Sequence, residues 1–142
     1  PDSVTNIGVY TFSGCTGLTR IVIPASVTEI GDNAFYGCSG LRSVSIPDSV
    51  TEIGDSAFSD CIGLTNIVIP DSVTNIGVYT FSGCTGLADI IIPDSVTKIG
   101  DRAFSGVSSD AHFTVTNKLM KKKLLNSDSN IRREQITVDV NL

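Results

Sequence analysis

The sequence is poor in the residues from which most catalytic and metal sites are built. It has no tryptophan, one histidine and one methionine in 142 residues, and only 18% of its residues are charged. A single histidine excludes a histidine-rich metal site, and the chain has no cysteine group at metal-ligand spacing and no phosphate-binding glycine loop. No apolar run approaches the roughly 20 residues that span a bilayer. We therefore expect no metal, no cofactor and no transmembrane segment.

Charge is distributed unevenly along the chain. Residues 1–117 contain twelve acidic and four basic residues, whereas residues 118–142 contain three acidic and six basic ones. Because binding a polyanion requires a basic face, the acidic body argues against nucleic acid as a partner. The chain begins at Pro1 within a repeat, without methionine or a signal-peptide pattern, which indicates a mature fragment of a longer protein.

The residues that are present form a repeat of 23 positions. Residues 70–87 repeat residues 1–18 without a change, and two diverged copies occupy residues 24–46 and 47–69. Self-similarity at a fixed period of this size indicates a solenoid, in which each coil packs against its neighbours. A single coil is not expected to fold alone.

Each copy contains the pattern L-x-x-[IV]-x-I-P, in which apolar and polar residues alternate before a proline. The alternation predicts a short strand that ends where proline cannot donate to the ladder. In the first copy Ile21 and Ile23 are expected to face inward, and Arg20 and Val22 outward. The strands are predicted near residues 21–23, 44–46, 67–69 and 90–92. The next segment, S-V-T-x-I-G, is a second strand or an extended segment on the other side of the coil.

The same period extends the repeats into a segment where no copy is visible. Adding 23 predicts further strands near residues 113–115 and 136–138. Between them, residues 117–125 begin with a candidate N-cap, Asn117, and place apolar Met120 and Leu124 four residues apart, which predicts a short helix. We therefore predict one domain over residues 1–142. Its repeats occupy residues 1–116, and a C-terminal cap with a helix, a turn over 126–130 and a final strand occupies residues 117–142.

The four cysteines stand one per repeat, at Cys15, Cys38, Cys61 and Cys84. Stacked coils would bring them within bridging distance, but parallel inward side chains have the wrong mutual orientation for disulfides. Val107 occupies the same column in the fifth copy. We therefore expect four free, buried thiols that pack as small apolar groups.

The combined pattern, L-x-x-[IV]-x-I-P-x-S-V-T-x-I-G-x-x-A-F-x-G-C, resembles the BspA-like, or treponemal-type, leucine-rich repeat from Pro1 to about Val115. It departs from the commonest leucine-rich consensus because serines stand where an asparagine ladder would follow the strand. The resemblance implies a right-handed leucine-rich-repeat solenoid that is predominantly β, rather than a horseshoe with outer helices. It also implies a cell-surface or secreted protein that binds host or neighbouring-cell proteins in adhesion.

One outward column of the strands changes at every coil, while the inward columns barely vary. A solenoid commonly binds through such a face. The candidate binding residues on this face are Arg20, Arg42, Asn66, Asp89 and His112. Asp89 and His112 lie one coil apart, about 5 Å, which makes a hydrogen-bonded pair plausible. Ser43 lies three coils from His112, so no Ser-His-Asp arrangement forms and no catalytic residue is expected.

A carboxylate column offers one candidate for calcium. Its members, each between Pro and Ser-Val, are Asp2, Asp48, Asp71 and Asp94. Calcium prefers carboxylate oxygens, but an aspartate at such a place commonly bonds nearby backbone N–H groups and fixes a turn. Ala25 replaces it in one coil. We therefore predict a turn-forming role and no metal site.

The leading hypothesis is a non-enzymatic protein-binding module, whose partner would be a host extracellular-matrix or surface protein. One alternative is a structural spacer or self-associating repeat element. Another is a β-solenoid hydrolase. Such an enzyme needs two carboxylates at neighbouring outward positions of the strands, and Asp89 is the only carboxylate in those columns. At the N-terminal end Val4, Ile7 and Phe12 have no evident cap. Either upstream residues cover this end, or two chains stack through it as a homo-oligomer.

Overall fold

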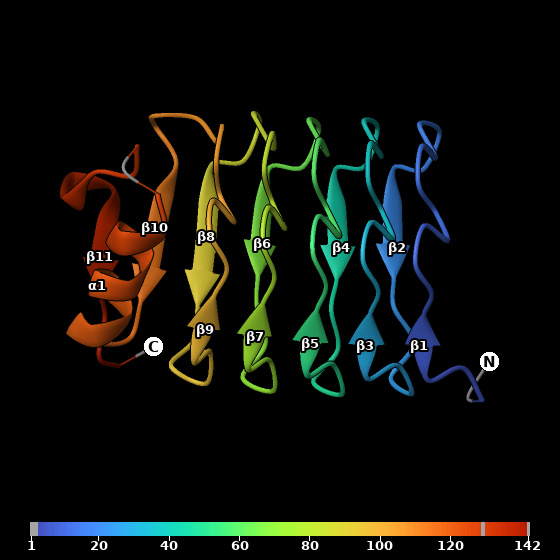
Figure 1. Ribbon diagram of the computed structural model, residues 1–142, viewed down its shortest axis with the longest axis horizontal. Helices are drawn as coiled ribbons and strands as arrows, with labels where there is room; N and C mark the ends of the chain where they lie inside the picture. The colour runs from blue at the N-terminus through green and yellow to red at the C-terminus, as the bar shows by residue number, and fades with distance from the viewer. Residues whose placement is uncertain (1–2, 129, 142) are drawn as a thin grey trace.

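The computed structural model describes residues 3–128 and 130–141. It is a predominantly β solenoid whose coils stack side by side from the N-terminal end to a helix-containing cap (Figure 1). Each coil of about 23 residues contributes two short strands, and every strand pairing is parallel. The predicted solenoid architecture is confirmed.

The S-V-T-x-I-G segments form the back sheet, which is a continuous five-stranded ladder in the order β1-β3-β5-β7-β9. In each strand a polar residue faces out and an isoleucine faces the core, as with Glu52 and Ile53. Of the two alternatives left open for this segment, the structure therefore shows the strand. The strands are β1 (Asn6–Ile7), β3 (Glu29–Ile30), β5 (Glu52–Ile53), β7 (Asn75–Ile76) and β9 (Lys98–Ile99).

The second set of strands forms the strand face on the other side of the coils. A strand occurs at all six predicted places. The first five begin one residue earlier than expected, because the outward residue that precedes the first inward residue also pairs with the neighbouring strand. Residues 23 apart are partners, as with Phe113 and Ile90. The strands are β2 (Arg20–Val22), β4 (Ser43–Ser45), β6 (Asn66–Val68), β8 (Asp89–Ile92), β10 (His112–Val115) and β11 (Ile136–Val138).

The strand face is interrupted between the second and third coils. Strands β2 and β4 pair with each other, and β6, β8, β10 and β11 form a separate ladder. Ile23 N–H donates to Ser45 O and Ile69 N–H to Ile91 O, each at 3.2 Å, but among the described residues Ile46 makes no equivalent bond. Near this place a long bond of 3.5 Å joins Thr65 N to Arg42 O. We call this interruption the seam.

Stacked phenylalanines run through the core along the solenoid axis. Consecutive rings lie 5.1 to 5.5 Å apart and within 10° of parallel. The column ends where Phe104 meets Phe113 edge-on, at 5.2 Å and 84°. Because every ring contacts rings in neighbouring coils, the column ties each coil to the next. Its members are Phe12, Phe35, Phe58, Phe81 and Phe104.

The cap lies over the last coil at the C-terminal end (Figure 1). Helix α1 (Lys118–Ser127) begins as predicted, because the Asn117 side chain accepts from Met120 N at 2.8 Å. Met120 and Leu124 are buried, and the helix contacts β9, β10 and β11. The helix continues to Ser127, so the turn predicted over 126–130 begins later than expected, and residue 129 lies outside the described residues. A short 3-10 helix, η1 (Arg133–Gln135), leads into β11.

Apolar side chains in the first coil are less buried than their counterparts. Phe12 and Leu18 are half-buried, whereas Phe35 and Leu41, one coil further, are fully buried. The described N-terminal coil therefore buries the core columns less completely than the coil that follows it.

Candidate functional site

The strand face presents most of the candidate binding residues to solvent. Arg20, Asn66 and Asp89 are exposed at the starts of their strands, and Arg42 is exposed just before β4. His112 is half-buried at the start of β10. The ladder brings Asn66, Asp89 and His112 side by side, each one coil from the next. Arg20 and Arg42 lie across the seam from them, so the candidate set divides into a basic part and a part that holds Asp89.

His112 makes a different contact from the one expected. Its Nε2 lies 2.8 Å from Thr137 Oγ1 on β11, and no hydrogen bond to Asp89 forms within the described part of the chain. The cap strand supplies the partner because Thr137 pairs with Thr114, which places its hydroxyl beside the imidazole. This contact fixes the histidine ring, which leaves Asp89 to solvent.

Two apolar residues on this face are absent from the candidate set. Val22 and Val68 are 70% and 59% exposed, although both are strand residues. Their apolar type at an outward position was the signal in the sequence. Val68 lines a groove of about 580 Å³ along the carboxyl ends of the strands, where the seam separates β4 from β6. Other residues that line it are Ser45, Asn66, Ile91 and Thr116. The strand face therefore combines exposed apolar area with charged groups.

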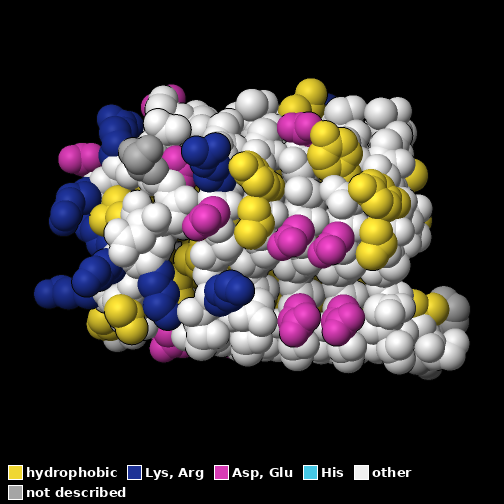
Figure 2. All heavy atoms as spheres, viewed as in Figure 1, with side chains coloured by type: hydrophobic (Ala, Val, Ile, Leu, Met, Phe, Trp, Pro, Cys, Tyr) yellow, Lys and Arg dark blue, Asp and Glu magenta, His cyan; other side chains and the backbone are white. Residues whose placement is uncertain are grey.

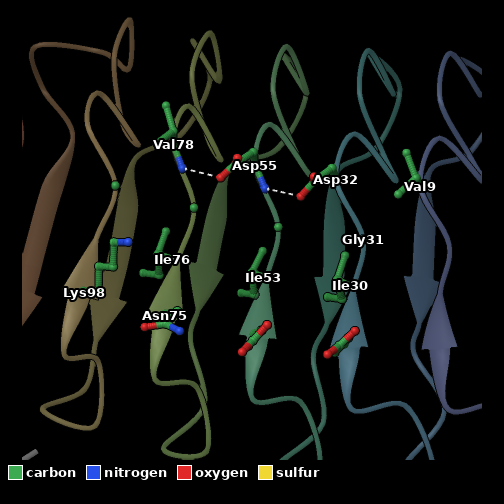
Figure 3. A pocket seen from close by; sticks show the side chains of 15 residues that line it. Val9, Ile30, Gly31, Asp32, Ile53, Asp55, Asn75, Ile76, Val78 and Lys98 are labelled. Carbon is green, nitrogen blue, oxygen red and sulfur yellow. Dashed lines mark hydrogen bonds between the residues drawn. The ribbon is translucent and has the colours of Figure 1, made fainter.

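A second groove, of about 470 Å³, crosses the back sheet (Figure 3). Its upper edge is an aspartate ladder. Asp32 Oδ1 accepts from Asp55 N, and Asp55 Oδ1 accepts from Val78 N, each at 2.8 Å. Glu29 and Glu52 line the opposite side. The aspartates are thus engaged in joining neighbouring coils, so we assign them a structural role.

Glycine is required beside this ladder because neighbouring coils approach closely. A Cβ added at Gly54 would lie 2.7 Å from Asp32 N, and one at Gly77 would lie 2.7 Å from Asp55 N. Real Cβ atoms do not come so close to backbone atoms, so the regular spacing of the coils depends on the absence of a side chain here. The glycine and aspartate of the I-G-D motif are therefore explained by the close stacking of neighbouring coils.

The cysteines are free thiols, as expected, and all but Cys15 are buried. Each buried thiol donates to a phenylalanine carbonyl in the preceding coil, as from Cys61 Sγ to Phe35 O at 3.2 Å. Burial raises the pKa of the Cys84 thiol to about 12 and that of Cys61 further. Because only a thiolate is an effective nucleophile or metal ligand, these groups act in packing.

The described residues hold no group of three or more His, Cys, Asp and Glu side chains that could bind a metal ion. Asp48, Asp71 and Asp94 are exposed, and within the described part of the chain their side chains make none of the hydrogen bonds predicted to fix the turn. The predicted mechanism, in which the aspartate side chain fixes the turn, is therefore wrong. The turn is closed instead by backbone bonds such as Val50 N to Pro47 O at 3.1 Å. Asp2 lies outside the described residues.

Acidic and basic side chains occupy different parts of the surface. In the view of Figure 2 acidic side chains lie over the middle coils, while basic ones gather at the C-terminal end. No helix within residues 3–128 and 130–141 has the length and apolar character needed to cross a bilayer.

Solved structures similar to this chain are leucine-rich repeat proteins. The leucine-rich repeat protein of T. pallidum is 37% identical, with a TM-score of 0.76 over 82% of this chain and 54% of its own. A leucine-rich cell surface protein of Faecalibacterium prausnitzii is 33% identical, with a TM-score of 0.80 over 87% and 33%. The chain thus spans about half and a third of these proteins.

A third structure, the pneumococcal vaccine antigen PcpA, is 19% identical and shares the fold, with a TM-score of 0.71 over 98% of this chain and 40% of its own. No curated protein matches the chain. A family model, the BspA type leucine rich repeat region in six copies, matches residues 1–132. The resemblance noted in the sequence is therefore confirmed, and the chain belongs to the BspA-type leucine-rich repeat family.

Proposed function

We propose that this chain is a non-enzymatic protein-binding module of a cell-surface protein, and that it binds through the strand face. The observation that carries the proposal is the outward column that changes at every coil, from Arg20 to His112. It is exposed at Arg20, Asn66 and Asp89, with Val22 and Val68 beside it. At 70% and 59% exposure, these two apolar side chains leave most of their surface to solvent. Protein interfaces combine such apolar contacts with a polar rim.

A solved relative supports the cell-surface location. The F. prausnitzii protein, 33% identical to this chain, is described as a leucine-rich cell surface protein. Adhesion to a host extracellular-matrix or surface protein is the specific role that we propose. The contrasting charges on the two sides of the seam would orient the partner, with an acidic region toward Arg20 and Arg42.

The test compares two variants that each change one residue in each of the same five coils. Immobilised chain is incubated with extracellular-matrix and serum proteins, and bound proteins are quantified. The strand-face variant carries Arg20→Ala, Arg42→Ala, Asn66→Ala, Asp89→Ala and His112→Ala. The back-sheet control carries Asn6→Ala, Glu29→Ala, Glu52→Ala, Asn75→Ala and Lys98→Ala, whose positions are paired coil by coil.

We expect the strand-face variant to lose at least about tenfold in affinity while the control retains binding, because interface energy concentrates in few residues. Both variants should keep the circular dichroism spectrum of the parent. Equal binding by the parent and the strand-face variant would contradict this function and favour a structural spacer.

End-to-end stacking is a second candidate function, for which we propose the open N-terminal coil. Phe12 and Leu18 are half-buried there, whereas Phe35 and Leu41 in the next coil are fully buried. A second coil of the same shape would complete their burial. Sedimentation equilibrium over a range of concentrations tests stacking of two chains. A monomer throughout would rule it out, and Phe12→Ser should weaken any dimer.

A further inference from the structure

The cap contains a groove between α1 and β11 that the strand-face proposal does not use. Its volume is about 490 Å³, and its apolar part is formed by Leu125 and Val138, which are half-buried and pack on the core. Around them stand four cationic side chains and one amide. The residues around the apolar part are Lys118, Lys121, Lys122, Asn126 and Arg133.

Among the residues that the structure describes, no carboxylate partners the four cations of this groove. No ion pair at 4.0 Å or less involves them within residues 3–128 and 130–141. The other two basic residues of the cap are engaged in the fold. Lys123 Nζ donates to Thr97 O at 2.9 Å, and Arg132 Nη2 donates to Ser109 O at 3.0 Å. Structural contacts therefore account for the cations outside the groove and for none of those inside it.

Helix α1 would be more stable without this arrangement of charge. Lys118, Lys121 and Lys122 are spaced i, i+3 and i+4, which places like charges on one side of the helix. The first turn contains no acidic residue, and Lys118 opposes the helix dipole there. A local arrangement that opposes stability without compensation is typical of a functional surface.

The chemistry of the groove selects one class of ligand. Unpaired cations attract carboxylates, and the apolar part formed by Leu125 and Val138 accepts an aliphatic side chain between them. No aromatic residue lines the groove to stack on a sugar ring, and its concave shape does not suit a flat membrane. The acidic coils, with twelve acidic against four basic residues, would repel an acidic segment elsewhere on the chain.

We propose that the cap groove binds an acidic polypeptide segment in which carboxylates flank an aliphatic side chain. Val138 belongs to β11 of the strand face but lies in its inward column, opposite Val115, and none of the candidate binding residues lines the groove, so the two proposals stand or fall independently. The cations supply attraction and orientation, and burial of the aliphatic side chain against Leu125 and Val138 supplies selectivity.

The probe is a short fluorescein-labelled peptide in which glutamates flank leucines, and the readout is fluorescence anisotropy with the full chain. Its affinity should fall as salt is raised, because charges on the surface are screened. The variant Lys118→Glu/Lys122→Glu should bind at least about tenfold more weakly. Its Tm should be equal to or above that of the parent, because acidic residues in the first turn favour the helix. A Tm that does not fall distinguishes loss of the binding site from loss of the fold.

The matched control, Lys98→Glu/Arg102→Glu, makes the same change in charge at two exposed positions outside the groove, and should bind within about twofold of the parent. The variant Val138→Thr should weaken the leucine peptide about fivefold and leave a glutamate–glycine peptide unaffected. The proposal is overturned if charge reversal leaves affinity unchanged, or if a glutamine–leucine peptide binds equally. It is also overturned if heparin fragments or phosphatidylserine vesicles bind through these lysines and the glutamate–leucine peptide does not.

Discussion

Asp60 and Gly83 occupy the same position of adjacent coils, and both have left-handed backbone, with φ of 61° and 78°. Glycine stands at this position in the other coils, at Gly14, Gly37 and Gly106. Asp60 N donates to Ser82 O at 2.7 Å, so the turn keeps its bond between coils despite the substitution. The third coil therefore holds an L-residue in a conformation that glycine adopts more readily.

The substitution Asp60→Gly should raise the free energy of unfolding by about 1 kcal/mol, because the left-handed conformation disfavours a Cβ. The midpoint of urea denaturation measures this change. Gly83→Ala is the opposite control and should lower the midpoint, since its Cβ would meet the Asp60 side chain. A lower midpoint for Asp60→Gly would show that the aspartate side chain stabilises the turn.

A serine column allows a hydrogen bond to be compared with an unpaired hydroxyl. Ser95 Oγ donates to Val73 O at 2.9 Å, whereas the buried Ser72 Oγ has no hydrogen-bond partner among the described residues. Ser95→Ala should cost about 1 kcal/mol, and Ser72→Ala should be neutral or stabilising, because removing an unpaired buried hydroxyl costs nothing in hydrogen bonding. Thermal unfolding of both variants checks this order. Equal losses would mean that Ser72 has a partner in solution.

Position along the phenylalanine column should determine the effect of truncation. Phe58 is fully buried and stacks on Phe35 and Phe81 at 5.1 and 5.5 Å. Phe12 is half-buried and stacks on Phe35 alone. Phe58→Ala should lower the free energy of unfolding by about 3–5 kcal/mol, and Phe12→Ala by clearly less. Denaturant titration measures both, and a larger loss at Phe12 would contradict the open N-terminal coil.

The solenoid and its cap could be predicted because the period propagates through packing. Adding 23 to Ile90 reached Phe113 and then Ile136, and the structure pairs Phe113 with both. The seam could not be predicted in this way. Ser43–Ser45 and Asn66–Val68 have the same strand pattern as their neighbours. Whether two such strands lie close enough to form ladder hydrogen bonds depends on the packing between their coils, which the repeat pattern does not specify.

The candidate site was predictable to the extent that alternation determines exposure. It placed Arg20, Asn66 and Asp89 outward, and they are exposed. Alternation could not predict that His112 contacts Thr137, because Thr137 lies on a cap strand whose sequence has diverged from the repeats. The cap groove was also beyond reach from the sequence, since Leu125 and Val138 meet only through the docking of α1 on the last coil.

The buried thiols should make stability fall at alkaline pH. Burial raises the pKa of Cys84 from its ordinary 9.0 to about 12, and that of Cys61 also rises. Below pH 9 both states are protonated and the full stability is present. Between about pH 9 and 12 the unfolded chain loses these protons while the folded chain keeps them, so stability falls by about 1.4 kcal/mol per pH unit and thiol. Valine fits this column at Val107. Urea titrations of Cys61→Val/Cys84→Val across this range should show a shallower decline than the parent, and an identical decline would mean that other groups cause it.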